Sequence, residues 1–162
     1  MAILEIVKYG DPRLREKCEP VAEFNDDIKK LIADMGDTLH SAKGLGLAGP
    51  QVGVMKRLFV YDMGEDGDGL HALINPKIIK KSGSDVCYEG CLSVPGLHGE
   101  VERAYKVTVT GINENGEPVR IKAQELLARC IQHETDHLDG VIFMDLADPE
   151  TIEPVDMDDA KK

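Results

Sequence analysis

One short segment constrains this chain more than any other: the H-E-x-x-H pattern formed by His133, Glu134 and His137. The surrounding sequence predicts a helix over residues 124–138, because apolar residues recur along one side at helical spacing and Gly140 can end it. On such a helix the two histidines lie one turn apart, about 6 Å along the axis, so both imidazoles can bind one metal ion. Glu134 projects about 100° around the axis from His133 and can reach a water on that ion without being a ligand.

A catalytic metal site normally has three protein ligands and one open position, so a third ligand must come from elsewhere. In the longer H-E-x-x-H-x-x-G-x-x-H pattern, Phe143 occupies the place of the third histidine. Glu150 and Glu153 stand in an acidic tail that offers no rigid platform. Cys130 precedes His137 by seven residues, roughly 10 Å along the helix axis, which is too far to share the ion with both histidines. We interpret Cys130 as a pocket or core thiol.

Two cysteines remain as candidates for the third ligand, Cys87 and Cys91. Cys91 is favoured, because the glycines and the proline around it indicate a tightly turned loop that can hold a thiolate in place. Cys87 stays open as an alternative. If both cysteines joined His133 and His137, the result would be a closed structural zinc site without an open coordination position.

A glycine-rich segment over residues 44–53 begins with a G-x-G-x-x-G pattern. A dinucleotide site is nevertheless not predicted, because the glycines follow a predicted helix (residues 25–43) and Pro50 interrupts the place of the phosphate-binding helix. An apolar, glycine-rich loop instead exposes backbone groups with which an extended peptide can pair. Gln51 adds a neutral amide donor that suits a developing oxyanion.

Composition limits the class of protein. The 162 residues include 19 Lys and Arg against 30 Asp and Glu, a formal net charge of −11. This length predicts one compact domain. The acidic balance disfavours a broad surface for nucleic acid or anionic lipid, and no basic patch stands out in the sequence. No segment approaches the roughly 18 apolar residues of a membrane span. Four cysteines in such a chain indicate thiols or metal ligands more than a disulfide framework, so we expect a cytoplasmic protein.

The remaining elements are predicted from local patterns. Strands are expected over residues 57–62, 70–81, 105–112 and 118–123, the last two joined as a hairpin, and an extended piece over residues 141–146. We therefore expect an α+β fold, in which small antiparallel or mixed sheets pack around a central helix that carries the H-E-x-x-H pattern.

Three segments, GLGLAGPQVG, EGCLSVPG and QHETDHLDG, resemble the signature motifs of the peptide deformylase family, in the family's order and at similar intervals. The similarity extends from the N-terminus to about residue 146. It implies a catalytic domain over residues 1–146, followed by an acidic, partly disordered tail over residues 147–162. It also implies a cytoplasmic, metal-dependent hydrolase that removes the N-formyl group from the N-terminal formylmethionine of newly made proteins and releases formate.

The resemblance assigns roles residue by residue. The metal ligands would be Cys91, His133 and His137, holding one divalent ion, Fe2+ in the cell, with Zn2+, Ni2+ or Co2+ able to replace it. Metal-bound water would attack the formyl carbon, with Glu134 as general acid and base. The Gln51 amide and the backbone N–H of Leu92 would bind the oxyanion. Substrate contacts are expected from Leu45, Gly46, Gly90, Leu92, Cys130 and His133.

Some features depart from the family pattern. Gly49 stands where alanine is usual, which is expected to loosen the backbone beside Gln51, and Leu45 replaces the more usual isoleucine. The longer basic C-terminal helix that some bacterial members use at the ribosome is not apparent, so transient ribosome contact is left open. A monomer without a direct nucleic-acid site is expected. The alternatives are an H-E-x-x-H metallopeptidase that cuts internal peptide bonds and the structural zinc module described above.

Overall fold

The structure, a computed structural model, describes residues 3–64, 67 and 69–155. Its helices are α1 (Asp26–Ala42), α2 (Glu125–Leu138) and the short α3 (Phe143–Leu146), with single 3-10 turns at η1 (Pro12–Arg15), η2 (Gly49–Val52) and η4 (Pro149–Thr151). Its strands are β1 (Gly46–Ala48), β2 (Leu58–Tyr61), β3 (His71–Ser82), β4 (Asp85–Cys91), β5 (Val94–Arg103), β6 (Lys106–Ile112), β7 (Pro118–Gln124) and β8 (Glu153–Pro154). The strand order β1-β2-β3-β6-β7 makes one sheet and β4-β5-β8 makes another.

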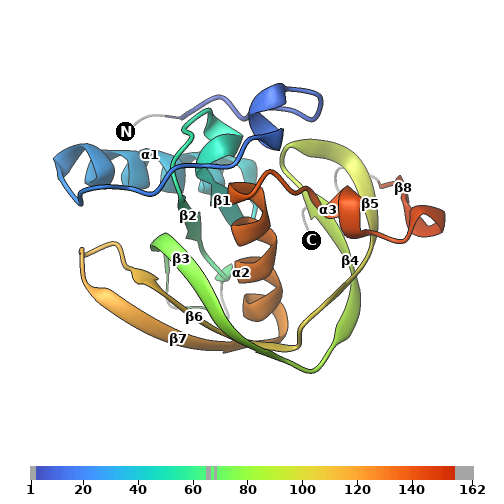
Figure 1. Cartoon of the computed structure of the whole chain (residues 1–162). Coiled ribbons are helices and arrows are strands. Elements are labelled where there is room, and N and C mark those ends of the chain that lie inside the picture. Colours follow the sequence, from blue (N-terminus) through green and yellow to red (C-terminus); the bar gives the residue numbers. More distant parts are fainter. Residues whose placement is uncertain (1–2, 65–66, 68, 156–162) are drawn as a thin grey trace.

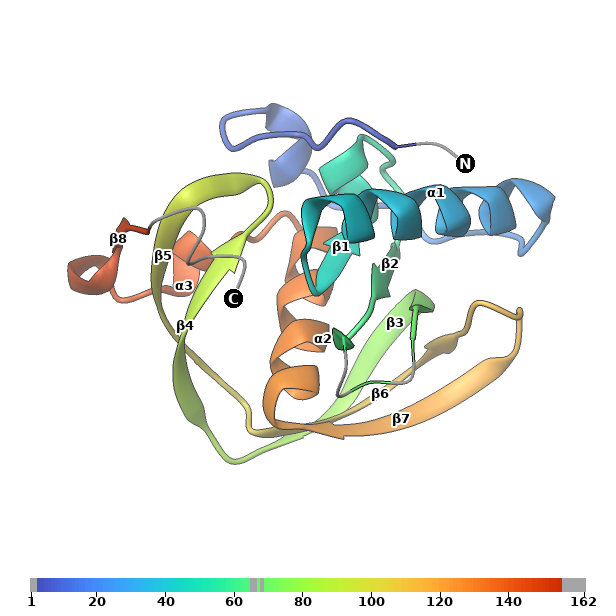
Figure 2. The ribbon, with the colours of Figure 1, turned by 180° about the vertical axis from the view of Figure 1, so that it is seen from behind.

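Helix α2 lies at the centre, with the five-stranded sheet on one side and the β4–β5 hairpin on the other (Figure 1 and Figure 2). Ala128 and Ile131 of α2 share one buried apolar cluster with Val107 and Val109 of β6. All paired strands of both sheets are antiparallel. This architecture confirms the predicted α+β fold of small sheets around the H-E-x-x-H helix.

Strand β2 is buried on both faces because a helix covers each of them. Phe59 belongs to the apolar cluster that includes α2, whereas Leu58 and Val60 belong to the cluster that includes α1. The two sets alternate along the strand, as opposite faces of a sheet require. Asn25 caps α1 by accepting a hydrogen bond from the Ile28 N–H at 3.0 Å, as its sequence position predicts.

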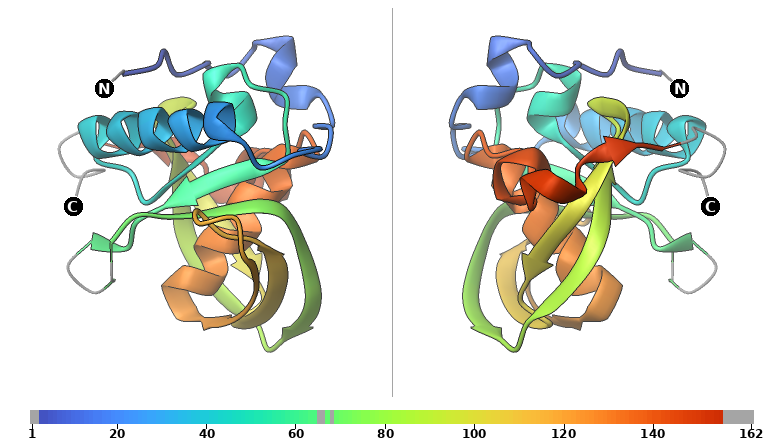
Figure 3. Two further views of the ribbon diagram at one scale, coloured as in Figure 1. Left: turned by 90° about the vertical axis from the view of Figure 1, so that its left-hand side faces the viewer. Right: turned by 90° about the vertical axis from the view of Figure 1, so that its right-hand side faces the viewer.

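The predicted hairpin over residues 105–123 is present as β6 and β7. The Asn113 side chain accepts hydrogen bonds from the Asn115 and Glu117 N–H groups and so closes the turn. Strand β3 pairs with the other edge of β6, and two register irregularities bend it. These bends curve the sheet around α2 (Figure 3).

The prediction of an extended piece over residues 141–146 was wrong, because Phe143–Leu146 forms α3. The Asp145 carboxylate accepts a hydrogen bond from the Ile142 N–H at the start of this helix and also pairs with Arg15. Apolar composition alone could not reveal this tertiary contact with the N-terminal segment.

After α3 the chain turns back onto the small sheet. The Asp148 N–H donates to the Glu100 carbonyl and the Val155 N–H to the Gly96 carbonyl, both at 2.9 Å. Strand β8 pairs with β5 at Leu97 and His98. The rest of the expected acidic tail, residues 156–162, lies outside the described residues. No helix in the described part of the chain is long and apolar enough to cross a membrane.

Candidate metal centre

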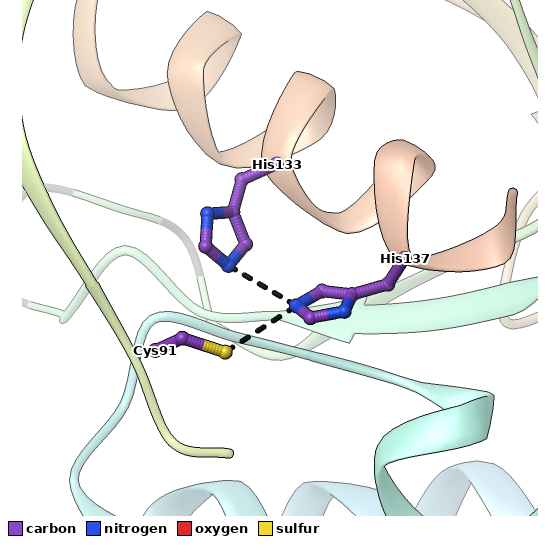
Figure 4. Close-up of side chains that lie close together, drawn as sticks. All are labelled: Cys91, His133 and His137. Atoms are coloured by element: carbon purple, nitrogen blue, oxygen red, sulfur yellow. Dashed lines mark hydrogen bonds between the residues drawn. The ribbon is translucent and has the colours of Figure 1, made fainter. Parts of the chain in front are cut away.

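Two elements far apart in the sequence bring three metal-binding side chains together. Helix α2 presents His133 and His137, both buried, and β4 ends at Cys91 facing them (Figure 4). His137 Nε2 lies 3.3 Å from His133 Nε2 and 3.4 Å from Cys91 Sγ. Within the described residues, these three form the one group whose donor atoms could hold an ion, all within 4.8 Å of one another.

The two separations from His137 Nε2, to His133 Nε2 and to Cys91 Sγ, match those between ligands of one tetrahedral ion. Nitrogen ligands at about 2.0–2.1 Å and a sulfur ligand at about 2.3 Å from a common centre lie about 3.3–3.6 Å apart. Three protein ligands would leave a fourth position open, as in a catalytic site. Cys87 is exposed and is not part of this group, which argues against the closed four-ligand zinc site.

Glu89 of β4 orients the first histidine from behind. Its Oε1 lies 2.9 Å from His133 Nδ1, which directs Nε2 of that ring towards Cys91 and His137. Glu89 is itself buried and accepts hydrogen bonds from the guanidinium groups of Arg103 and Arg129. Burial raises the pKa of Glu89, but the bonds from His133 and Arg103 outweigh burial and hold this pKa at about 2. Glu89 is therefore a permanent anion beneath the site.

The charges around the donor atoms favour a cation. Burial lowers the pKa of His133, but the charge of Glu134 and the hydrogen bonds with Cys91 and Glu89 raise it well above its ordinary value. The same groups that attract a proton to His133 also attract a divalent ion. Burial lowers the pKa of His137 well below its ordinary value, so that ring is a neutral ligand.

Glu134 lies beside the ligands and points into the pocket. The residue is 4% exposed, and Oε2 lies 3.9 Å from His133 Nε2. Among the described residues Oε1 has no hydrogen-bond partner. Burial raises the pKa of Glu134 to about 7, against the opposing charge of His133. A carboxylate with such a pKa can exchange a proton near neutral pH.

Gln51 is fixed with its amide nitrogen towards Cys91. Its Oε1 accepts a hydrogen bond from the Ala48 N–H at 2.9 Å, and its Nε2 lies 3.1 Å from Ser93 Oγ and 3.4 Å from Cys91 Sγ. The carbonyl contact determines which end of the amide faces the site. Leu92 follows Cys91 directly, so its backbone N–H lies at the same turn between β4 and β5.

The site opens into a pocket of about 430 Å³. The sequence-predicted site residues that line it are Leu45, Gly46, Gln51, Gly90, Cys91, Leu92, Cys130, His133 and Glu134, and only His137 lies behind the lining. Cys130 is buried with Sγ 3.9 Å from the Leu45 carbonyl oxygen. The lining also includes Tyr88 and Val155, which the sequence did not suggest.

Sequence reasoning missed the residues that support His133. Glu89 was visible as an acid inside the EGCLSVPG segment, but nothing in the sequence told whether it was buried. Arg103 and Arg129 carried no recognisable signal, because their role depends on the pairing of β4 with β5 and on the packing of α2 against both.

The fold and this site define a metal-dependent hydrolase built on an H-E-x-x-H helix. The family model described as "Polypeptide deformylase" matches residues 3–152. The chain belongs to the peptide deformylase family, the metal-dependent enzymes that remove the N-formyl group from nascent proteins, and this confirms the family and the activity predicted from its three motifs.

Named relatives and solved structures agree with the family match. A peptide deformylase from Halothermothrix orenii is 54% identical over 145 residues, 90% of this chain and 94% of the relative, and one from Carboxydothermus hydrogenoformans is 52% identical over 148 residues, covering 91% and 95%. A crystal structure of a peptide deformylase from Legionella pneumophila superposes with a TM-score of 0.88 at 44% identity, covering 92% of this chain and 88% of that one. The enzyme from Synechococcus elongatus in complex with actinonin gives 0.85 at 44% identity, covering 90% and 79%.

Proposed function

We propose that the pocket between α2, β1 and β4 performs the deformylation, with Cys91, His133 and His137 as ligands of one divalent ion. The observation that supports this assignment is the convergence of a thiol and two imidazoles from α2 and β4 on one point at the wall of a pocket. The donor separations of 3.3 and 3.4 Å and the permanent anion Glu89 behind His133 fit a bound cation.

The identity of the ion is proposed from its ligands. Two neutral imidazoles and one thiolate leave a divalent ion with one net positive charge, and the soft sulfur suits Fe2+, with Zn2+, Ni2+ and Co2+ as substitutes. When bound, such an ion brings the pKa of a coordinated water towards about 7 and polarises a carbonyl oxygen.

Glu134 is proposed to move the protons of the reaction. Its unpartnered Oε1 accepts a proton from the attacking water, and the protonated carboxyl then donates this proton to the methionine amine as the formyl C–N bond breaks. Formate leaves with the added oxygen. The raised pKa of about 7 suits both directions of transfer.

The negative charge that develops on the formyl oxygen needs donors in fixed positions. We propose Gln51 Nε2 and the Leu92 N–H for this role. The Ala48 N–H already holds the other end of the Gln51 amide, so the donor does not have to reorient during the reaction. Cys91 Sγ, at 3.4 Å, marks how close Nε2 lies to the reacting centre.

The methionine side chain is proposed to enter the apolar part of the pocket formed by Leu45, Leu92 and Cys130, next to His133. The peptide backbone would run between Leu45 with Gly46 on one side and Gly90 on the other, so that it pairs with both. This arrangement requires a neutral substrate end, which an N-formylated methionine supplies and a free, charged amine does not.

Beyond the site, we propose that the enzyme acts as a cytoplasmic monomer on formylated nascent peptides, with transient contact to the ribosome. Residues 1–146 are proposed as the catalytic domain and residues 147–162 as its acidic C-terminal segment, of which Val155 lines the pocket.

A formate-release assay on anaerobically purified protein, with metal analysis of the same sample, tests the proposal. A formyl-Met peptide is expected to yield formate, whereas an acetyl-Met peptide and internal peptide bonds are expected to stay intact. Cleavage of internal bonds would instead identify a metallopeptidase. Replacement of Cys91 by serine is expected to remove metal and activity, and Cys87→Ser is the matched control that keeps both.

A further inference from the structure

Five cationic side chains gather on one face of the sheet formed by β3, β6 and β7. Val107 and Val109 of β6 point to the other face, where they pack with α2. Lys106, Thr108 and Thr110 alternate with these valines along β6, so their side chains point to the outer face. Their direct neighbours on β3 and β7 point to the same face. Figure 1 and Figure 3 show α2 on the inner side of the curved sheet. The outer face carries Lys77, Lys80, Lys106, Arg120 and Lys122, all exposed, and is called the basic face below.

The register arranges four of these cations in two rows. Lys80 and Lys122 flank Thr108 across three strands, and Lys77 and Arg120 flank Thr110 in the next row. The rows are about 7 Å apart along the strands, and the cations within a row are about 10 Å apart across them. The frame of positive charges surrounds Thr108, which is buried, and Thr110, which is partly buried.

No acid neutralises this frame. Within residues 3–64, 67 and 69–155, none of the five cations makes an ion pair or a side-chain hydrogen bond with a carboxylate. Glu117 and Glu125 lie near the two ends of β7, and Glu125 accepts a hydrogen bond from the Tyr105 hydroxyl. Since the whole chain carries −11, subtracting these five positive charges leaves −16 on the rest of it. Five of the 19 lysine and arginine residues thus share one face of an acidic protein.

We propose that the basic face binds the phosphate backbone of RNA. Lysine and arginine side chains bind phosphates without regard to sequence. Positive charges spaced along and across a sheet can meet several phosphates of one strand at once.

A single RNA strand fits this face better than a bilayer or an acidic protein. A broad anionic surface that covered the basic face would also approach the acidic remainder of the molecule and be repelled by it, whereas a narrow strand need touch only the face. At its outward positions the middle strand carries Thr108 and Thr110 instead of the large apolar side chains by which peripheral proteins insert into membranes. Charge complementarity therefore favours RNA as the ligand of the basic face.

The basic face lies on the far side of the sheet from the metal centre. The inner face of the sheet packs against α2. On the side of α2 that faces away from the sheet, His133 and Glu134 line the pocket. Binding of RNA would leave the pocket open to a peptide. Because nascent proteins emerge from an RNA-rich particle, such binding would hold the enzyme close to its substrate.

The test measures binding of the full chain to a fluorescently labelled, unstructured 20-nucleotide RNA by anisotropy at 25–200 mM KCl. In a plot of the logarithm of the wild-type binding constant against the logarithm of the salt concentration, we expect a negative slope. Its magnitude should be up to about 3.5, which is about 0.7 for each of five neutralised phosphates. The triple variant Lys80→Gln, Arg120→Gln, Lys122→Gln is expected to bind at least about tenfold more weakly, and the magnitude of its slope should be lower by about 2.

The matched control removes three exposed lysines away from the sheet, Lys8→Gln, Lys17→Gln and Lys56→Gln, and changes the net charge equally. It is expected to bind RNA within about twofold of wild type. An equal loss in both variants, or wild-type protein that does not bind RNA at 25 mM KCl, would overturn the inference.

Stronger binding to phosphatidylserine vesicles or to poly-glutamate than to RNA would overturn it as well. Thermal unfolding and formate release from a soluble formyl-Met peptide are expected to be unchanged in both variants. If the triple variant does not fold, the double variant Lys80→Gln, Lys122→Gln removes one complete row, and the double variant Lys8→Gln, Lys17→Gln is its charge-matched control. The inference depends on charge placement and not on the catalytic roles, so its failure and theirs are distinguishable.

Discussion

The side chain of Glu134 is buried and yet keeps one carboxylate oxygen free. Its Oε1 has no partner among the described residues, and Oε2 lies where a Cβ on Gly46 would come within 2.6 Å. The carboxylate can occupy this place at the pocket wall only because Gly46 of β1 has no side chain. At the scale of single residues, the chemistry depends on this one close approach between a helix and a strand.

Replacement of Glu134 by alanine removes the proposed proton carrier but none of the proposed ligands. We expect turnover to fall by roughly 10²–10⁴-fold while the bound metal stays. Formate release and metal analysis on the same sample measure both. Thr135→Ala is the matched control, because Thr135 is the next residue on α2 and its Oγ1 has no partner either in the described structure; that variant is expected to keep near-normal activity. Near-normal turnover of the Glu134 variant would contradict the mechanism.

Gly46→Ala tests the close approach directly. A methyl group there would lie 2.6 Å from Glu134 Oε2 and 2.9 Å from its Cδ, so the carboxylate must shift. A displacement of about 1 Å can cost about 10²-fold in rate, and we expect a loss of this order in kcat. Metal content and the midpoint of thermal unfolding, measured on the same variant, are the controls, because a shift of the carboxylate alone should leave both near the wild-type values. Wild-type activity of Gly46→Ala would show that Gly46 is not needed for this reason.

At the scale of elements, a buried cluster of charges joins β4, β5 and α2 behind the metal centre. Glu89 of β4 accepts hydrogen bonds from Arg103 of β5 and Arg129 of α2, and Arg103 also pairs with Asp136. The Arg129 guanidinium further donates to the Val101 and Asp85 carbonyl groups. The geometry of His133 therefore depends on how three elements pack together.

Glu89→Gln should weaken both metal binding and folding. The amide no longer holds His133 Nδ1–H as a charged acceptor does, and we expect metal affinity to fall by about 10–100-fold. Two buried guanidinium groups also lose their common anion, which costs on the order of 3–5 kcal/mol in the free energy of unfolding. Metal titration and urea unfolding measure the two effects. Asp136→Asn, which changes a partly exposed partner of Arg103 alone, is expected to do much less.

The packing around Gly49 adds to the sequence interpretation of this turn. The family's usual alanine suggested that glycine loosens the backbone beside Gln51, but a Cβ at Gly49 would lie 2.7 Å from the Val54 carbonyl oxygen and 2.8 Å from that of Lys56. In this chain η2 packs too tightly for a side chain. We expect Gly49→Ala to destabilise the fold by about 1–3 kcal/mol, measured as a lower midpoint of thermal unfolding. An unchanged midpoint would show that the loop from Val54 to Lys56 can move away.

The elements differ in how much the sequence reveals of them. Helix α2 and the β6–β7 hairpin follow from patterns within a few residues: apolar spacing in one case, the turn at Asn113 in the other. For the third metal ligand, ligand geometry left two candidates, Cys87 and Cys91. Helix α3 was missed because its start depends on Asp145 and on contact with Arg15. The basic face could not be predicted either, because it appears only when cross-strand register brings Lys80 next to Lys122.

At the scale of the whole molecule, net charge and charge placement carry different information. The value of −11 disfavours a broadly basic surface. It does not describe the outer side of β3, β6 and β7, where positive charges gather, nor the pocket, whose rim is mainly apolar with Leu45, Leu92 and Leu97. The formylated end of the peptide and the RNA would thus bind to two surfaces that differ in chemistry and lie on opposite sides of α2.

Removal of the metal distinguishes a catalytic centre from a structural one. The interior contains three apolar clusters, and these are built mainly from side chains other than Cys91, His133 and His137. Folding therefore does not depend on an ion in the way that a small zinc-stapled module does. We expect a chelator to abolish formate release while circular dichroism retains the native α+β signal, and Fe2+ or Ni2+ added anaerobically to restore activity.

The midpoint of thermal unfolding is nevertheless expected to fall on chelation. An ion that binds only the folded chain stabilises it by about 2.7 kcal/mol at a free concentration 100 times its Kd, and this contribution is lost with the metal. Cys87→Ser should respond to the chelator as wild type does, because Cys87 lies outside the donor group. Complete loss of secondary structure on chelation would show that the ion closes a structural site, and an equal effect of Cys87→Ser and Cys91→Ser on metal content would add Cys87 to its ligands.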